Sequence, residues 1–242
     1  MILRLAGLSK RFGAVVVADN IDLDVARGEA LGIIGANGAG KSSLFNLITG
    51  VVIPDSGTVV MDGKDLTNVS LRNRCVAGIG RSFQIPRPFE SLTVFENLLV
   101  AAEYGRGRGA LGATELCGSI LERTGLASHA NTLGGKLTLL NRKRLEMARA
   151  LATQPDIVLL DEIAGGLTEA ECSELVAFIK QVNQEGVTIV WIEHVVHALL
   201  SVVSRLVVLE FGRKIADGEP SAVMADPAVR RSYLGIEDEV AA

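Results

Sequence analysis

A glycine-rich loop followed by a lysine and a serine has the residue types that phosphate binding needs. Gly35-Ala-Asn-Gly-Ala-Gly-Lys41-Ser42 fits the spacing G-x-x-x-x-G-K-[ST] in full. Glycines let the backbone curl so that its N–H groups point at phosphate oxygens, and the helix that follows adds its positive end. We expect Lys41 to reach the β- and γ-phosphates of a nucleotide and the Ser42 hydroxyl to bind Mg²⁺. The predicted nucleotide contacts are Gly35, Ala36, Asn37, Gly38, Ala39, Gly40, Lys41, Ser42 and Ser43.

Two carboxylates end an apolar run later in the chain. Ile157–Leu160 is followed directly by Asp161 and Glu162. Asp161 is the type of residue that holds Mg²⁺, directly or through water. Glu162 is placed to polarise an attacking water, and general-base catalysis of this kind raises a rate by about 10²–10⁴-fold. The second acid favours hydrolysis over kinase chemistry, because it acts on water.

Strands and helices must bring these two groups together. Short apolar runs predict strands at Ile2–Leu5, Ile21–Val25, Ala30–Ile34, Thr58–Met61, Ile157–Leu160, Thr188–Ile192 and Leu206–Glu210. The later runs are continuous, which is typical of strands covered on both faces. The patterns between them predict helices at Ser42–Thr49, Arg142–Thr153, Glu169–Gln184 and His194–Val203. Alternating strands and helices indicate an α/β fold with a largely parallel sheet.

The middle of the chain has a different pattern. Between residues 86 and 135 the strand signals thin out, and Val94–Glu103 and Thr114–Thr124 have helical patterns with a loop at Tyr104–Gly109 between them. We interpret this stretch as the start of a mainly helical lobe. We therefore expect one domain over residues 1–242, in which the core is formed by residues 1–85 and 156–242 and a helical subdomain by residues 86–155.

Further motifs lie around the loop and the acidic pair. They are Lys10-Arg-Phe12-Gly13, Arg81-Ser-Phe-Gln84, Leu137-Thr-Leu-Leu-Asn141 and Trp191-Ile-Glu-His194. In this order the chain resembles the ATP-binding subunits of ABC transporters over nearly its whole length, and among them those of branched-chain amino acid importers and their relatives for amides and urea. The resemblance implies a P-loop NTPase (RecA-like) core with a mostly parallel sheet, an N-terminal antiparallel β subdomain and an inserted α-helical subdomain.

The resemblance also assigns roles to single side chains. It implies that Phe12 stacks on the adenine, an interaction worth about 0.5–1.5 kcal/mol beyond burial. It implies that Gln84 reaches Mg²⁺ or the attacking water, and that His194 donates to the γ-phosphate and holds the water near Glu162. The implied cofactors are ATP and Mg²⁺. The implied catalytic residues are Glu162, His194 and Gln84, and the implied Mg²⁺ ligands are Ser42, Gln84 and Asp161.

The signature segment departs from the family's usual L-S-G-G-Q. Its last four positions hold Thr138, Leu139, Leu140 and Asn141, so leucine replaces both glycines. Thr138 keeps a hydroxyl that can cap the following helix, whose N-terminus the resemblance places against the γ-phosphate of a second subunit. Glycine permits a close backbone approach that leucine does not. Ile163 and Thr168 likewise replace the usual proline and Asp or Asn after Glu162.

Partners are implied in the same way. Two ATPase subunits, identical or sister, would close head to tail around ATP, and transmembrane permease subunits would convert this closure into alternating access. A periplasmic solute-binding protein would supply the solute. Residues 86–97 are expected to form a docking surface for a permease helix by exposing Phe89 and Phe95. The alternatives are an exporter of the lipopolysaccharide type and a soluble ABC ATPase outside transport, although residues 87–97 and Tyr233-Leu-Gly235 favour the importer group.

Composition and residue spacing argue against several other classes of protein. Lys plus Arg number 24 against 28 for Asp plus Glu, and the resulting net charge of −4 argues against a nucleic-acid partner. Cys75, Cys117 and Cys172 have the spacing of neither a metal motif nor a disulfide framework. The longest apolar zone, Thr188–Val203, is interrupted by charged and histidine residues, whereas a membrane span needs about 20 largely uncharged residues. We expect a peripheral protein at the cytoplasmic face of the inner membrane.

Overall fold

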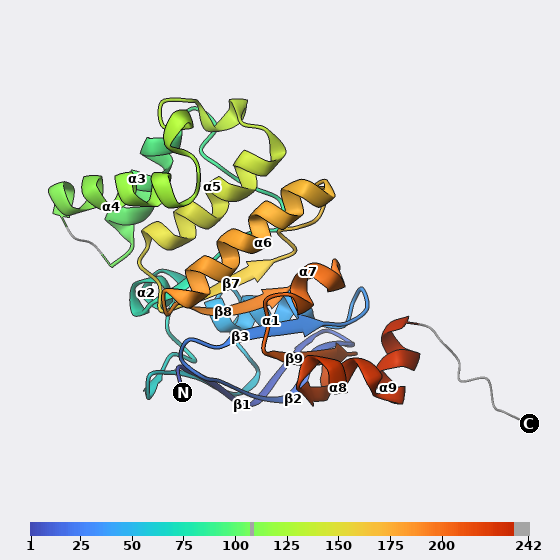
Figure 1. The fold of residues 1–242 in the computed structure, drawn as a ribbon. Helices are drawn as coiled ribbons and strands as arrows, with labels where there is room; N and C mark the ends of the chain where they lie inside the picture. The colour runs from blue at the N-terminus through green and yellow to red at the C-terminus, as the bar shows by residue number, and fades with distance from the viewer. Residues whose placement is uncertain (107–108, 235–242) are drawn as a thin grey trace, which may run out of the picture.

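A six-stranded sheet crosses the centre of the computed structural model, which describes residues 1–106 and 109–234 (Figure 1). The strand order is β10-β9-β3-β8-β7-β6, and every neighbouring pair is parallel except β9 and β10. The strands span Ala30–Ile34 (β3), Ile79–Arg81 (β6), Ile157–Asp161 (β7), Thr188–Ile192 (β8), Arg205–Glu210 (β9) and Arg213–Gly218 (β10).

The continuous apolar strands bury both of their faces. Successive side chains point to opposite faces of a sheet. Val158 and Leu160 of β7 accordingly lie in one hydrophobic core, and Ile157 and Leu159 lie in the other. The sheet therefore separates two cores, as the run of apolar residues predicted.

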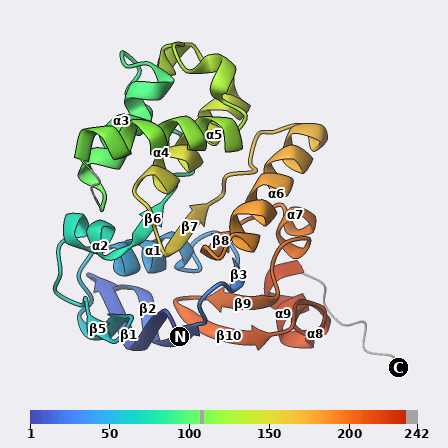
Figure 2. The same cartoon turned by 60° about the vertical axis from the view of Figure 1, so that its left-hand side comes forward.

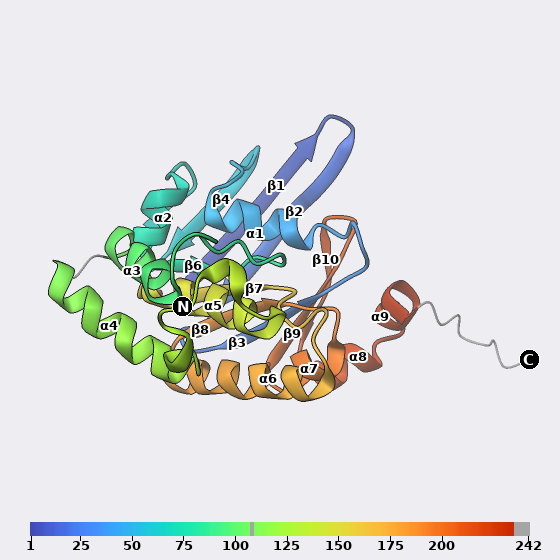
Figure 3. The same cartoon turned by 90° about the horizontal axis from the view of Figure 1, so that it is seen from above.

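The core that contains Ile157 and Leu159 lies between the parallel sheet and a second, antiparallel one. This sheet has the order β2-β1-β4-β5, with strands at Leu3–Phe12 (β1), Val15–Val25 (β2), Ser56–Met61 (β4) and Lys64–Asp65 (β5). Helix α1 (Lys41–Thr49) packs between the two sheets through Leu44, Phe45 and Ile48 (Figure 3). The antiparallel part that the family resemblance implied is confirmed.

The second core lies under helices. Helices α3 (Val94–Tyr104), α4 (Gly109–Arg123) and α5 (Leu139–Ala152) pack together as a lobe, and α6 (Glu169–Gln184) and α7 (Val196–Leu200) cover the same face of the sheet (Figure 2). The remaining helices are α2 (Leu71–Ala77), α8 (Pro220–Ala225) and α9 (Pro227–Val229), with short turns at Ala127–His129, Gly134–Lys136 and Arg230–Leu234. In residues 1–106 and 109–234, no helix combines the length and apolar character that crossing a bilayer requires.

Threonine side chains cap the starts of α3, α5 and α6. Thr93 with Glu96 and Thr168 with Glu171 form capping boxes at the starts of α3 and α6. The Thr138 hydroxyl accepts a hydrogen bond from the Asn141 backbone N–H, so the predicted cap of α5 is confirmed. These caps satisfy backbone donors that a helix start would otherwise leave unpaired.

The predicted α/β class is confirmed, but several boundaries are wrong. The helix expected at His194–Val203 covers only Val196–Leu200, because Glu193 and His194 turn toward the loop after β7 and Val195 is not helical. Tyr104 belongs to α3 and Gly109 to α4, so the predicted loop shrinks, and residues 107–108 lie outside the described residues. Strands β5, β6 and β10 and helices α2, α8 and α9 were not predicted.

A buried arginine ties α2 to α1. The Arg74 side chain is fully buried and donates to the backbone carbonyls of Leu47 and Ile48, in the last turn of α1, at 2.7 and 2.8 Å. It also donates to the carbonyls of Val69 and Thr67. A cation at a helix C-terminus is favourable, since it satisfies carbonyls that have no partner in the helix. Arg74 therefore stabilises the C-terminal end of α1, whereas the glycine-rich loop joins its N-terminal end.

Replacing Arg74 with methionine should lower the free energy of unfolding by about 3 kcal/mol, because two buried and two partly buried carbonyls lose their donor. Denaturant unfolding of the two proteins measures the difference. Arg72→Met is the matched control on the same helix: Arg72 is exposed, and its replacement should change stability by less than about 0.5 kcal/mol. Equal effects of the two substitutions would contradict the role of Arg74.

Candidate nucleotide-binding and catalytic site

The glycine-rich loop lies between β3 and α1 and is enclosed by its neighbours. A side chain at Gly35 would meet the Leu209 carbonyl oxygen at 2.3 Å, and one at Gly40 would meet the Val17 carbonyl oxygen at 2.4 Å. Gly40 also has φ +102°, a conformation that disfavours residues with a Cβ. The absence of side chains at these two positions therefore lets the loop fit between β2 and β9.

Lys41 is the first residue of α1, and its side chain folds back over the loop. The ammonium donates to the carbonyl oxygens of Gly35 at 2.8 Å and Ala36 at 3.1 Å, and the side chain is buried. Burial lowers the pKa of Lys41, and the nearby carboxylates of Glu162 and Asp161 act in the opposite direction. Lys41 thus lies close enough to Asp161 and Glu162 for their charges to interact, although more than 100 residues separate them in the sequence.

Asp161 ends β7 and is 5% exposed. Its Oδ2 atom pairs with the Arg81 guanidinium at 2.8 Å, whereas its buried Oδ1 atom has no hydrogen-bond partner among the described residues. Buried polar atoms in native proteins normally have a partner. A carboxylate oxygen in this state fits a water or a cation that the chain itself does not supply.

The surroundings of Asp161 fit Mg²⁺. This ion takes one or two protein oxygens and fills its other positions with water and phosphate. Ser42 is exposed at the start of α1, and Gln84, three residues after β6, donates to Glu162, the residue that follows Asp161. No cluster of three or more His, Cys, Asp or Glu side chains occurs within residues 1–106 and 109–234, and Mg²⁺ bound together with phosphates does not require one. The assignment of Ser42, Gln84 and Asp161 as ligands remains a prediction.

Glu162 is held by side chains from the two neighbouring strands. Its Oε1 atom lies 2.8 Å from His194 Nε2, after β8, and its Oε2 atom accepts a hydrogen bond from the Gln84 amide, after β6. Its own backbone has φ +47°, which is uncommon for a residue with a side chain and marks a sharp turn at the end of β7. The structure therefore brings together all three side chains that were predicted to be catalytic.

Three charged residues near this cluster were not predicted as site residues. Arg81 pairs with Asp161, Lys143 of α5 points its ammonium at the Glu162 carbonyl oxygen 3.5 Å away, and Glu193 accepts from the Ala164 N–H at 2.8 Å. Burial raises the pKa of Glu193 to about 7. Sequence signals existed: Glu193 directly follows an apolar strand, and Arg81 stands three residues before Gln84.

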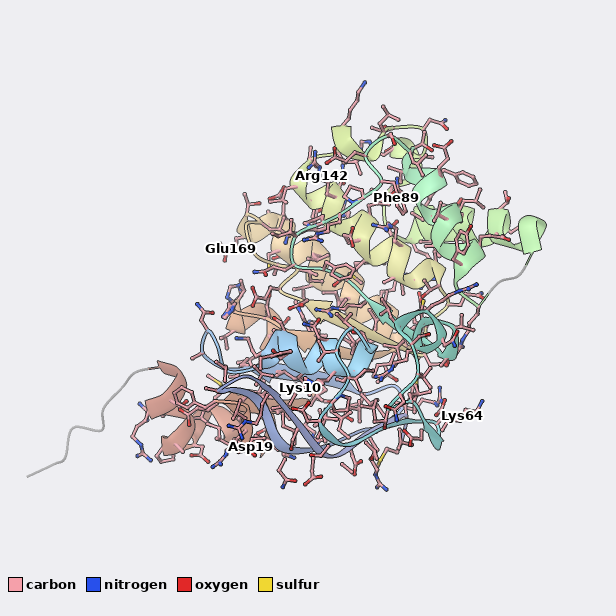
Figure 4. The ribbon with its side chains drawn as sticks, turned by 180° about the vertical axis from the view of Figure 1, so that it is seen from behind. Lys10, Asp19, Lys64, Phe89, Arg142 and Glu169 are labelled. Carbon is pink, nitrogen blue, oxygen red and sulfur yellow. The ribbon has the colours of Figure 1, made fainter. Side chains whose placement is uncertain are left out.

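Phe12 is the last residue of β1 and pairs with Val15 beside the turn that joins β1 to β2. It is half exposed, and the Lys10 ammonium lies 5.5 Å from the centre of its ring. Figure 4 shows Lys10 on the antiparallel-sheet side of the molecule, beneath α1. An exposed ring at this edge is available for stacking, and the predicted contact with adenine remains a prediction.

The signature segment lies on the opposite side. Arg142, one residue after Asn141, lies in the helical lobe, apart from α1 and Lys10 (Figure 4). The Asn141 amide turns toward His129, with 3.1 Å between the nitrogen atoms, while Leu139 is 44% exposed. Hence one chain does not bring its signature segment and its glycine-rich loop together, and the predicted trans contact of Thr138, Leu139, Leu140 and Asn141 remains a prediction.

Comparison with known families identifies the domain. Residues 18–165 match the family described as ABC transporter, and residues 213–239 match the branched-chain amino acid ATP-binding cassette transporter family. The first match covers more than half of the chain and includes the glycine-rich loop, Gln84, the signature segment and the acidic pair.

Two transporter ATP-binding proteins are similar to this chain over nearly its whole length. The chain is 34% identical to the high-affinity branched-chain amino acid transport ATP-binding protein LivG of Salmonella typhimurium, over 97% of this chain and 98% of LivG. It is 33% identical to the lipopolysaccharide export system ATP-binding protein LptB of Haemophilus influenzae, over 97% of each.

Solved structures agree with these sequence matches. The ADP conformation of an ATP-binding cassette of an ABC transporter has a TM-score of 0.87 and 32% identity, over 97% of this chain and 99% of that one. A bacterial ABC transporter cassette solved as a dimer has a TM-score of 0.81 and 25% identity, over 90% and 98%. The expected P-loop NTPase fold is confirmed, and the chain belongs to the family of ABC transporter ATP-binding subunits and is an ATPase.

Proposed function

We propose that this chain hydrolyses ATP to drive the import of branched-chain amino acids or related polar amides. The observation that carries the catalytic part is the convergence of Gln84 and His194 on Glu162, next to Lys41. The match of residues 213–239 to the branched-chain family and the similarity to LivG support this choice of substrate class. The solute itself would be selected by the permease and by a periplasmic solute-binding protein.

Within the site, each residue has a defined task. The backbone of residues 35–43 and the Lys41 ammonium bind the triphosphate, and Lys41 exchanges its carbonyl partners for phosphate oxygens. Glu162 orients the attacking water and accepts its proton, while His194 and Gln84 keep the carboxylate in place. His194 also faces the position where negative charge grows on the γ-phosphate, and Phe12 packs on the adenine.

The metal would be held by Ser42, Gln84 and Asp161, with the remaining positions filled by water and phosphate oxygens. Bound there, Mg²⁺ would neutralise charge on the β- and γ-phosphates during transfer to water. The unpartnered Oδ1 atom of Asp161 is the observation that supports this assignment.

A second ATPase subunit completes the site. The open, exposed face of the glycine-rich loop and the distant signature segment of the same chain support a head-to-tail dimer, in which each α5 N-terminus caps the nucleotide of its partner. The partner is an identical or a sister subunit. Closure of the dimer would exclude bulk water, and hydrolysis would reopen it.

The permease would dock in an apolar groove beside Gln84. The groove encloses about 390 Å³ between α2, β6, α3 and α5, and Leu71, Phe83 and Tyr104 lie exposed along it. A short permease helix with apolar side chains and an acidic end fits this surface, because the Arg72 side chain also lies along the groove. The chain would thereby sit at the cytoplasmic face of the inner membrane.

The expected docking surface needs a correction. Phe95 is partly buried and packs against the helical core, so it does not present its ring for docking. Phe89 is exposed but lies outside the groove, where Arg149 stacks on it at 5.0 Å. Phe95 lies in the first turn of α3 beside the buried Val94 and Leu98, so the packing of this helix in the lobe partly covers it.

An exporter of the lipopolysaccharide type is the second candidate, since LptB is nearly as similar as LivG. Affinity purification of the tagged chain from detergent-solubilised membranes, with mass spectrometry of the co-purified permeases, distinguishes the two. Branched-chain-type permeases together with a sister ATPase support the importer, whereas permeases of an outer-membrane lipid pathway would overturn it.

Replacing Glu162 with glutamine should lower the ATP turnover number by about 10²–10⁴-fold, because the amide cannot accept the proton of the attacking water. ATP binding should be retained, since Lys41 and the loop are unchanged. Phosphate release and equilibrium binding of a fluorescent ATP analogue measure the two quantities. Glu169→Gln, at the exposed start of α6, is the matched control and should leave turnover unchanged. Normal turnover in Glu162→Gln would remove Glu162 as the base.

Glu193 should make stability depend on pH. Its folded pKa of about 7 lies above the ordinary glutamate value, so the stability that it contributes is complete below about pH 4.5 and is lost as the pH rises through 7. Lys143, Glu162 and His194 are the charged or titratable groups around it. Unfolding of the parent and of Glu193→Gln between pH 4.5 and 8 tests this: the parent should lose stability relative to the variant as the pH rises. A difference that does not change with pH would show that Glu193 has an ordinary pKa.

A further inference from the structure

Arg81 is enclosed between the phosphate-binding helix and the metal-binding carboxylate. Its Nη2 atom lies 2.8 Å from Asp161 Oδ2, and its Nη1 atom donates to Asn46 Oδ1 at 2.7 Å. Its guanidinium also lies over two rings, 5.7 Å from the centre of Phe45 and 5.2 Å from that of Phe83. The side chain is 10% exposed, and its two terminal nitrogen atoms and the two rings hold it, whereas its Nε atom has no hydrogen-bond partner among the described residues.

The sheet explains why the ion pair forms. Strands β6 and β7 are parallel neighbours with Arg81 opposite Leu159, so the carboxyl end of β6 lies next to that of β7. A guanidinium is a rigid planar fork that can bond two partners in different directions, which an ammonium does less well. Arg81 thereby connects Asn46 of α1 to Asp161 of β7 through one side chain.

The pair also decides which Asp161 oxygen is left for another ligand. Oδ2 is occupied by Arg81, and Oδ1 is buried without a partner among the described residues. A charge-assisted hydrogen bond of this length restricts rotation of the carboxylate about its last torsion. Removing Arg81 would leave a buried carboxylate that is free to turn and has lost its compensating charge.

On its other side, Arg81 reaches the surface. Arg81 and Phe83 both line the apolar groove described above, and the Phe83 ring is 45% exposed there. A partner that packs against Phe83 therefore presses on the ring that supports the guanidinium. One series of contacts thus runs from the groove through Phe83 and Arg81 to Asp161.

We propose that Arg81 is a positioning residue for Asp161, and that Phe83 makes this positioning responsive to what fills the groove. In this role Arg81 would bind Asp161 through Oδ2 and leave Oδ1 available to the metal. The inference rests on the proposed function for the metal and for the occupant of the groove. It adds a second connection between groove and site, alongside Gln84.

The test measures nucleotide binding without turnover. In a Glu162→Gln background, binding of a fluorescent ATP analogue is titrated first in EDTA and then against increasing Mg²⁺. Arg81→Met should leave the affinity in EDTA unchanged and raise the half-saturating Mg²⁺ concentration about tenfold, which corresponds to about 1.4 kcal/mol. Arg81→Lys keeps the charge but loses the fork, and it should give a smaller rise.

Phe83→Ala should raise the half-saturating Mg²⁺ concentration about threefold, because the guanidinium loses one of its two rings. Phe89→Ala is the matched control. Phe89 is as exposed as Phe83 and also lies under an arginine, but that arginine is Arg149 and not Arg81, so the variant should keep the parent's Mg²⁺ dependence. The double variant Arg81→Met with Phe83→Ala should be no worse than Arg81→Met alone, since Phe83 acts through Arg81.

The possible results are distinguishable. Half-saturating Mg²⁺ that stays the same or falls in Arg81→Met, or effects of Arg81 and Phe83 that simply add, would overturn the inference. Failure of the parent to bind the analogue in EDTA would instead count against the proposed nucleotide site. If Arg81→Met does not fold, Arg81→Lys and Phe83→Ala still decide, because a shift in Mg²⁺ dependence with unchanged binding in EDTA is required of both.

Discussion

The turn at Glu162 is the feature on which the catalytic arrangement depends. Parallel strands place their carboxyl ends at one edge of the sheet, and β6, β7 and β8 are successive neighbours. The residues that follow these strands, Gln84, Glu162 and His194, therefore meet in front of Lys41 at the start of α1. Because Glu162 has a left-handed backbone conformation, its side chain can point to both neighbours at once. The strain is held by buried contacts at its carbonyl and at the next loop residues.

Two routes lead from this turn into the helical lobe. Lys143 of α5 reaches the Glu162 carbonyl, and its ammonium interacts favourably with the carboxylate of the buried Glu193. Arg81, the last residue of β6, contacts Asp161 and also lines the groove between α2, β6, α3 and α5. The signature helix and the groove are thus both in contact with the same few residues. An ATPase whose turnover has to be coupled to partners on two different faces needs such connections.

Much of this arrangement could be predicted from the sequence, and the limits have physical causes. The glycine-rich loop and the pair Asp161–Glu162 are short motifs whose chemistry the spacing reveals. Strands β3 and β8 follow from continuous apolar runs, and α6 follows from its helical period. Strand β6 has three residues and α2, which ends just before it, has seven, so neither has a run long enough to show a period. Arg81, Lys143 and Glu193 act through burial, which comes from the tertiary fold. The exposure of Phe95 was misjudged because burial of an aromatic depends on which face of its helix packs inward.

Hydrogen–deuterium exchange with and without ATP tests most directly whether Lys41 and the acidic turn act on the same nucleotide. The parent chain is compared with Lys41→Ala, with exchange followed in residues 35–43, 161–166 and 193–196. If all three segments belong to one site, ATP should slow exchange in all of them in the parent and in none of them in Lys41→Ala. Protection confined to residues 35–43, with the turn at Glu162 unaffected, would show that the two groups serve different sites and would contradict the account.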